Sequence, residues 1–152
     1  MFVVVNVHGK INSSDPVRKA LGELKVERKF TASVVPDDAA TVGTLKLCKE
    51  FVAWAPLDSD LLTTLLEKRG MVSESRRLDS AALSKLGFKK YKDLAEKILK
   101  ENKRLSAIGG IRPFFRLSPP KGGFKSSLRR QYTDRGTLGS NPKLPDIVRR
   151  ML

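Results

Sequence analysis

Seven cationic side chains lie close together near the C-terminal end of the chain, between residues 112 and 139. The only acidic residue in that stretch is Asp134. Guanidinium and ammonium groups at this density attract phosphate oxygens, and nearby rings can stack on exposed bases. The seven cations are Arg112, Arg116, Lys121, Lys125, Arg129, Arg130 and Arg135. We interpret this stretch as an RNA-binding segment.

Proline and glycine interrupt the same segment. Pro119-Pro120 is followed almost at once by Gly122 and Gly123, and such residues argue against a regular helix or a central strand. The two glycines would let the backbone approach a phosphate closely, or would simply form a turn. Four aromatic residues are interleaved with the cations: Phe114, Phe115, Phe124 and Tyr132. A solvated, disordered tail is the alternative, and the aromatic residues favour packing or stacking instead.

Catalytic groups are scarce in this chain. His8 and Cys48 are its only histidine and cysteine, so neither a cysteine-based zinc site nor a histidine cluster can form. Cys48 falls on the apolar side of a predicted helix and is interpreted as a core residue, while His8 is interpreted as a surface or RNA-facing residue. Lys121 and its glycines lack the spacing of a nucleotide-binding loop. The sequence predicts no catalytic residue, no metal site, no cofactor and no small-molecule substrate.

The overall charge also indicates a polyanionic partner. The 152 residues carry a formal net charge of +14, and the sequence pI is about 10.2. Residues 1–56, 57–111 and 112–152 contribute +2, +4 and +8, so the charge rises toward the C-terminal end. Nucleic acid is the first candidate and an anionic membrane surface the second. No apolar run approaches the ~20 residues of a membrane span, and no helix pairs a basic face with large aromatic residues.

The first third of the chain alternates between strand and helix patterns. Strands are predicted at residues 2–8, 30–35 and 51–55, which are rich in apolar residues. One helix is predicted to begin with Asp15 as N-cap and Pro16 in the first turn, and another runs from residue 38 or 41 to residue 50. The first strand is too short and too soon followed by Gly9 for a signal peptide. We expect one core of seven residues, namely Val3, Val5, Val7, Ala20, Leu21, Leu24 and Leu45.

The remainder divides into a helical part and the basic part. Helices are predicted at residues 57–69, 80–86 and 93–104, and a last short helix at residues 145–152. We therefore predict three units: a β-α-β-α-β core at 1–56, a helical domain at 57–111 and a basic extended segment at 112–152. Three basic pairs outside that segment are either ordinary surface charges or additional phosphate contacts: Arg28-Lys29, Arg76-Arg77 and Lys89-Lys90.

The order of these motifs resembles the long archaeal form of the L-thirty family of large-subunit ribosomal proteins, whose eukaryotic counterpart is the L-seven protein. The likeness covers essentially the whole chain. The matching features are Val17-Arg18-Lys19-Ala20-Leu21, Gly43, Phe115-Arg116-Leu117, Pro119-Pro120-Lys121-Gly122-Gly123-Phe124, the stretch 136–139 and the closing helix 147–152. The chain departs from the family where His8 and Lys121 replace arginine and where Ser118 replaces histidine. Val42 and Thr44 also differ from the usual arginine and methionine.

The resemblance implies an α+β fold related to the ferredoxin-like arrangement, with a three-stranded antiparallel sheet and two helices on one face. It further implies a structural role in the large ribosomal subunit of the cytoplasmic ribosome, with ribosomal RNA, 5S rRNA and neighbouring ribosomal proteins as partners. Arg18 and Lys19 in the first helix join the basic segment as candidate RNA contacts. The alternative function is an RNA- or DNA-binding module that acts outside the ribosome.

Overall fold

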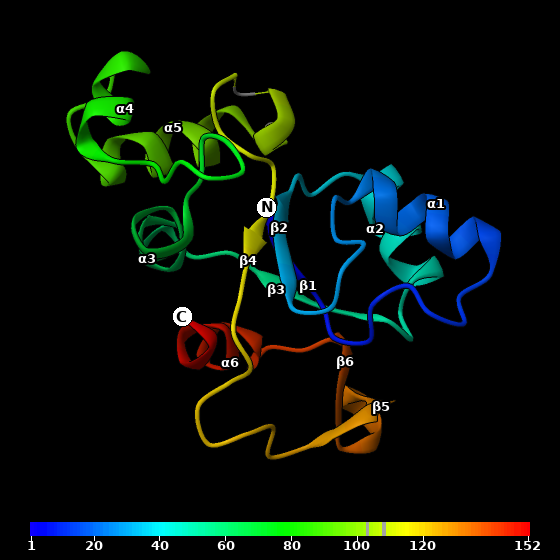
Figure 1. Cartoon of the computed structure of the whole chain (residues 1–152). Helices are drawn as coiled ribbons and strands as arrows, with labels where there is room; N and C mark the ends of the chain where they lie inside the picture. The colour runs from blue at the N-terminus through cyan, green and yellow to red at the C-terminus, as the bar shows by residue number, and fades with distance from the viewer. Residues whose placement is uncertain (103, 108) are drawn as a thin grey trace.

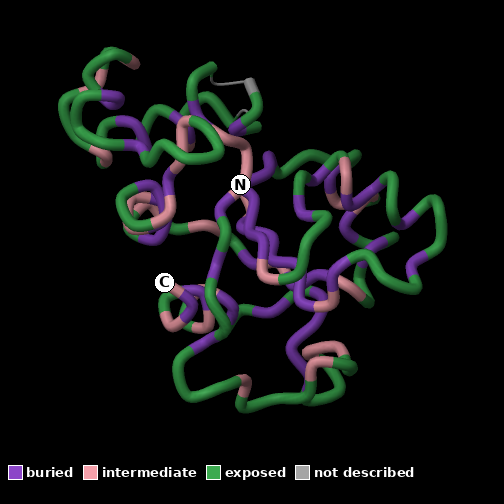
Figure 2. Tube along the Cα trace, in the orientation of Figure 1, coloured by how far each residue is buried: buried purple, intermediate pink, exposed green. Residues whose placement is uncertain are grey.

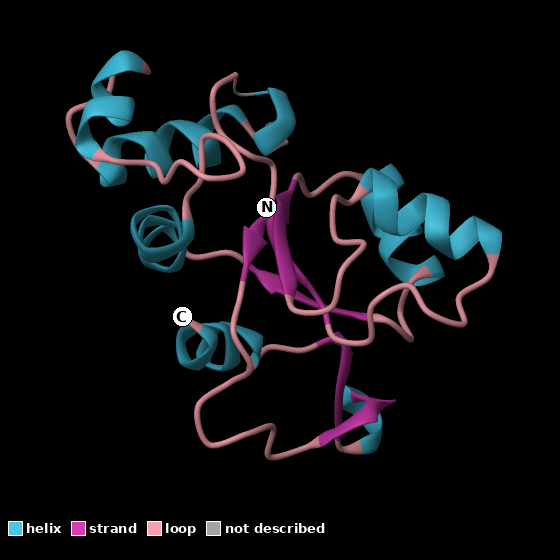
Figure 3. Cartoon of the chain, viewed as in Figure 1, coloured by secondary structure: helices cyan, strands magenta, loops and turns pink. Residues whose placement is uncertain are grey.

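The computed structural model describes residues 1–102, 104–107 and 109–152. It is an α+β structure in which helices cover a twisted sheet (Figure 1, Figure 3). In chain order the elements are β1 (Phe2–Asn6), α1 (Asp15–Glu23), β2 (Thr31–Val35), α2 (Ala39–Leu47), β3 (Val52–Pro56), α3 (Ser59–Arg69), α4 (Ser80–Lys85), α5 (Tyr91–Glu101), η1 (Leu105–Ala107), β4 (Phe115–Arg116), β5 (Ser127–Gln131), η2 (Tyr132–Asp134), β6 (Gly136–Ser140) and α6 (Leu144–Met151).

β1 is the structural centre of the sheet. It pairs antiparallel with both β2 and β3, so that Val4 lies between Ser33 and Trp54. Each strand of this three-stranded unit has five residues, and its apolar, largely β-branched side chains suit a buried pleated surface. The predicted β-α-β-α-β order and the antiparallel three-stranded unit are therefore present.

Helices cover both faces of the sheet, contrary to the single core expected from the sequence. Val4 packs on one face with α1 and α2, in a cluster that includes Leu21, Leu24 and Leu45. Val3 and Val5 pack on the opposite face with α3, α5 and α6. Figure 2 shows the buried strands between these layers. The prediction was wrong because a strand buried on both faces has an almost continuous apolar run, which does not reveal which side faces which helix.

The helical part packs against the sheet through two amphipathic helices. Leu61, Leu62, Leu65 and Leu66 of α3 are buried, and α5 contributes Leu94, Ala95 and Ile98. α5 begins two residues earlier than predicted and ends at Glu101. The predicted helix 93–104 includes Lys103, which lies outside the described residues.

The C-terminal segment adds strands to both edges of the three-stranded unit. β4 pairs with β2 through Thr31–Arg116 and Ala32–Phe115, and β6 runs parallel to β3. β5 then pairs with β6, which gives a six-stranded sheet in the order β4-β2-β1-β3-β6-β5. The expected three-stranded sheet is thus only its central part. β6 also corrects the expectation that this segment contains no central strand, because a strand lies on each side of it.

One smaller feature also differs from what the sequence predicts. The N-cap of α1 is Ser14 rather than Asp15, and Pro16 still lies in the first turn. The larger of the two hydrophobic clusters includes residues from all three predicted units, among them Val5, Leu62 and Val148. The division into units at 1–56, 57–111 and 112–152 stays a prediction.

The two-sided packing can be tested by mutation. Leu21 and Leu62 are fully buried on opposite faces of the sheet. Leu21→Ala and Leu62→Ala should each lower the free energy of unfolding by about 2–5 kcal/mol, as other large-to-small core changes do. Since the two side chains share no cluster, the two effects should add in the double variant to within about 0.5 kcal/mol. Chemical denaturation of the four proteins measures this, and strong coupling between the sites would contradict it.

Candidate nucleic-acid interface

The predicted RNA-binding residues do not form one continuous strip. Arg112 precedes β4 and Arg116 lies on it, Lys121 to Lys125 form a loop against α6, and Arg129 and Arg130 lie on β5. Arg135 follows η2 and is exposed. The first group borders two hollows in the surface, and the second and third groups border one hollow each.

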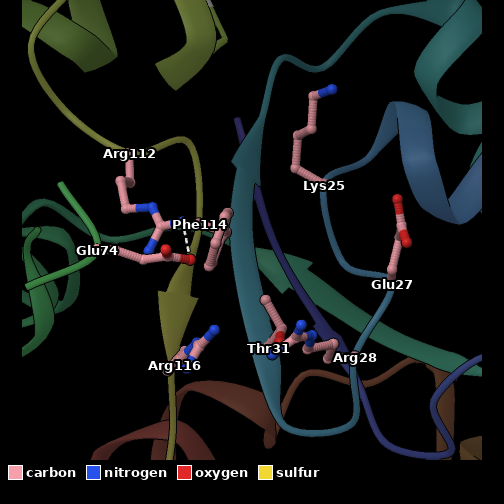
Figure 4. A pocket seen from close by; sticks show the side chains of 8 residues that line it. All are labelled: Lys25, Glu27, Arg28, Thr31, Glu74, Arg112, Phe114 and Arg116. Carbon is pink, nitrogen blue, oxygen red and sulfur yellow. Dashed lines mark hydrogen bonds and ion pairs between the residues drawn. The ribbon is translucent and has the colours of Figure 1, made fainter.

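Two adjoining hollows flank β4, and we call their lining together the β4 site. Arg112, Phe114, Arg116 and Glu74 line both of them. Figure 4 shows the first hollow, between the loop after α1 and the strand β4. The β4 site carries seven cations against two acids, Glu27 and Glu74. The cations are Lys25, Arg28, Lys68, Arg69, Arg77, Arg112 and Arg116.

Only part of this positive charge is neutralised within the protein. Arg112 lies 3.4 Å from the Glu74 carboxylate, and its guanidinium lies 4.8 Å from the centroid of the Phe114 ring. Arg69 donates to the Ser118 hydroxyl at 2.8 Å. In the described part of the chain, neither Arg28 nor Arg116 has an ion pair through its side chain. The β4 site therefore presents free cations next to a half-buried ring, which suits phosphates and exposed bases.

Five of these cations were not among the predicted site residues. Arg28 and Arg77 had been noted only as members of basic pairs, and Lys25, Lys68 and Arg69 had not been singled out. Lys25 and Arg28 come from the loop after α1, Lys68 and Arg69 from the end of α3, and Arg77 from the connection between α3 and α4. The pairing of β4 with β2 brings the loop after α1 beside Arg116. Apart from the basic pairs that contain Arg28 and Arg77, no local pattern marks these residues, because the site is assembled from segments that are distant in sequence.

The loop with Lys121, Gly122 and Gly123 is fixed by the closing helix α6. Arg150 donates from its guanidinium to the Lys121 and Gly123 carbonyls at 3.4 and 3.2 Å. The backbone N–H of Lys121 in turn donates to the Arg150 carbonyl at 3.0 Å. Gly122 and Gly123 have φ values of +77° and +72°, which only glycine adopts readily. The glycines thus form a turn that exposes Lys121 to solvent.

A third hollow lies between this loop, η2, β6 and α6, and we call it the C-terminal hollow. Its charged rim includes Lys125, Lys143 and Arg150, and its walls include Phe124 and Tyr132. Of these residues, the sequence analysis named only Lys125 as a binding residue. Lys143 and Arg150 were missed because they belong to the closing helix and its N-terminus, which were interpreted as structure alone.

Arg129 and Arg130 are exposed on β5, at the edge of the sheet. They line a fourth hollow together with His8 at the end of β1. His8 Nε2 lies 2.7 Å from the Leu128 carbonyl, so that a proton on this nitrogen donates to β5. His8 is half-buried and ties β5 to the end of β1, rather than being simply a surface residue.

The remaining predicted residues lie elsewhere or have another role. Arg18 and Lys19 are exposed on α1, and Arg18 pairs with Asp15 at 3.6 Å. Phe115 is fully buried and cannot stack on a base, because β4 turns it into the core. Phe124 stacks on Phe30, with centroids 6.0 Å apart and an angle of 22° between the rings.

Cys48 is a core residue, as the sequence analysis expected. It is fully buried against α1, and its Sγ lies 4.0 Å from the Val17 carbonyl oxygen. Burial, and secondarily the negative charge of Glu23, raises the pKa of the thiol to about 11. A thiol in this state is a poor nucleophile. The described residues contain no group of three or more histidine, cysteine, aspartate or glutamate side chains placed to hold a metal.

Gly136 provides a test of the β5–β6 pairing. A Cβ at this position would overlap the backbone carbonyl of Arg130, so Gly136→Ala should separate the strands and cost about 1–3 kcal/mol of stability. Gly43→Ala is the matched control, since nothing lies within 4 Å of a Cβ there. In the middle of α2 this change should instead stabilise the protein by up to about 1 kcal/mol. Urea denaturation distinguishes the two, and equal effects would contradict the pairing.

The reactivity of Cys48 provides a second test. With a pKa near 11 instead of 9.0, only about one thiol in a thousand is ionised at pH 8 in the folded protein, against about one in ten when unfolded. A disulfide reagent that releases a chromophore should therefore label the native protein far more slowly than the denatured protein. Comparable rates in the two states would show that the thiol is accessible and ionisable.

Comparison with known proteins identifies the family. No family model matches the chain. In the described ranges, no helix has the length and apolar character needed to cross a membrane. Three relatives are each named large ribosomal subunit protein uL30. The protein of Thermofilum pendens is 32% identical over 100% of this chain and 99% of its own length. Those of Nitrosopumilus maritimus and Korarchaeum cryptofilum are each 33% identical, over 99% and 100% of this chain and 97% and 95% of their own lengths.

These matches cover nearly the whole of this chain and of each relative, and the identities of the first three are 32% or 33%. The chain therefore belongs to the uL30 family of large ribosomal subunit proteins.

Proposed function

We propose that this protein is a structural constituent of the large ribosomal subunit and that it binds ribosomal RNA through its basic surfaces. The observation that carries the proposal is the β4 site, where seven cations face two acids and where Arg28, Arg77 and Arg116 have no ion pair among the described residues. Membership of the uL30 family indicates that the protein acts in the ribosome, and therefore in the cytoplasm. The role is structural and not enzymatic.

The physical task of such a protein is to reduce repulsion between RNA segments. Each phosphate that meets a lysine or arginine releases condensed counterions, and this release favours binding at low salt. Because the hollows lie at different places on the sheet, cations in separate groups can engage different stretches of backbone. The proposed RNA contacts are Arg18, Lys19, Arg112, Arg116, Lys121, Gly122, Gly123, Lys125, Arg129, Arg130 and Arg135, together with Lys25, Arg28, Lys68, Arg69 and Arg77.

In this proposal each of the three predicted units has its own role in RNA binding. Residues 1–56 supply the ferredoxin-like-related frame, residues 57–111 support the β4 site from α3, and residues 112–152 carry most of the contacts. We also propose a contact with 5S rRNA, and this part of the proposal rests on the resemblance to the L-thirty family. Chemical footprinting of 5S rRNA within assembled subunits tests it, since an unprotected 5S rRNA would remove that partner.

The salt dependence of binding tests the β4 site. Replacing Arg28 and Arg116 by alanine should weaken binding to a large-subunit rRNA fragment and flatten the log–log salt slope by about 0.7–0.9 for each phosphate that is no longer neutralised. Lys46→Ala with Lys49→Ala removes the same charge from exposed positions outside the described hollows. Filter binding at several salt concentrations measures both, and an equal weakening in the two double variants would refute a localised site.

An RNA- or DNA-binding module outside the ribosome is the rival function. Sedimentation in high-salt gradients separates the two, because a ribosomal constituent stays with the large subunit whereas a loosely bound module dissociates. The same gradient reports on assembly with neighbouring ribosomal proteins. Recovery of the protein only at the top of the gradient would reject the ribosomal role.

A further inference from the structure

We propose that the C-terminal hollow is the binding site for one unpaired nucleotide of the RNA, and this inference rests on the proposed function for its ligand class. The hollow has a volume of about 330 Å3. It combines two aromatic rings, a rim of cations and a polar floor, whereas a surface that only neutralises phosphates needs the cations alone.

The rings supply a surface on which a base can stack. Phe124 and Tyr132 both line the hollow and are both half-buried. Phe124 is fixed by its stacked contact with Phe30. A ring held in this way loses little freedom when a base packs on it.

The cations supply the phosphate contacts. Lys125, Lys143 and Arg150 line the hollow, and the one acid among its lining residues is Asp146, which pairs with Arg149 at 3.6 Å. The net charge of the residues that line the hollow is therefore positive. A nucleotide whose base enters the hollow would carry its flanking phosphates toward these side chains, and a base that is paired within a duplex cannot enter.

The floor contains a polar group without a partner. Thr137 lines the hollow and is only 1% exposed, and its Oγ1 has no hydrogen-bond partner among the described residues. Asn141 beside it is satisfied, because its amide donates to the Thr137 carbonyl and its Oδ1 accepts from the Lys143 N–H. A buried hydroxyl that lacks a partner is unfavourable, and a base edge in the hollow would offer it both donors and acceptors once the Thr137 side chain turns its Oγ1 toward the hollow. Thr137 therefore becomes the group that discriminates between bases.

The frame of the hollow is formed before any RNA arrives. Arg150 fixes the loop through the Lys121 and Gly123 carbonyls, and the Ser118 N–H donates to the Met151 carbonyl at 3.0 Å. Val148 and Met151 anchor the same helix in the core. A site that is already ordered does not need to be ordered by its ligand, so the binding free energy is retained.

The test uses an RNA hairpin with a single-nucleotide bulge and the same hairpin fully paired, each in fluorescence-anisotropy titrations. The wild-type protein should prefer the bulged hairpin by at least about fivefold, which corresponds to one stacked base. Tyr132→Leu should remove that preference and leave the affinity for the paired hairpin unchanged, and Tyr132→Phe should retain it. A thermal melt of each variant verifies that it is folded.

Thr137→Val provides an independent arm. The isosteric change should leave the melting temperature equal or higher, since it removes the unpaired hydroxyl. It should also abolish the differences in affinity among hairpins that carry each of the four bases in the bulge. If the wild type binds both hairpins equally well, the nucleotide site is refuted while RNA binding stands. If it binds neither hairpin, the proposed function fails and this inference fails with it.

Discussion

Backbone pairing of the C-terminal segment with both edges of the three-stranded unit determines where every other functional feature lies. β4 adds to β2 and so brings Arg116 beside Thr31, close to Arg28. β6 adds to β3 on the other side and carries β5 with it. Without these pairings the β4 site would not exist, because its cations belong to three separate stretches of chain. The sheet therefore sets the spacing between the basic surfaces.

Charge repulsion explains why those surfaces are separate. Two like charges 4 Å apart near a protein surface repel by about 4 kcal/mol, and residues 112–152 alone carry a net charge of +8. Folding the segment onto two edges of a sheet spreads this charge over several hollows and leaves most of the cations solvated. Where cations are crowded, nearby acidic side chains reduce the remaining charge repulsion, as Glu74 does for Arg112. An RNA phosphate would relieve it further, which is why a compact basic protein and a folded RNA stabilise each other.

The sequence was sufficient to predict the helices and the strands of the first third and to locate the basic segment, because each has a local signature. It was insufficient to predict features that depend on contacts between distant parts of the chain. Val3 and Val4 look alike in sequence but face different helices. The glycines and prolines of the basic segment argued against a central strand, yet Gly136 lies in β6, where the absence of a Cβ lets the Arg130 backbone approach. Lys25 has no signature in the sequence and Arg28 is only one member of a basic pair, since the tertiary pairing of β2 with β4 is what makes them part of a site.

The closing helix α6 links the hydrophobic core to the basic loop. Its buried face, with Leu144, Val148 and Met151, is held by the same cluster that packs α3 against the sheet. From its other side Arg150 holds the carbonyls of Lys121 and Gly123. The shape of the loop is thus inherited from core packing rather than from the loop's own residues. Because anything that binds the folded loop and not the unfolded chain stabilises the folded state, RNA bound there would also stabilise α6 and, through it, the core.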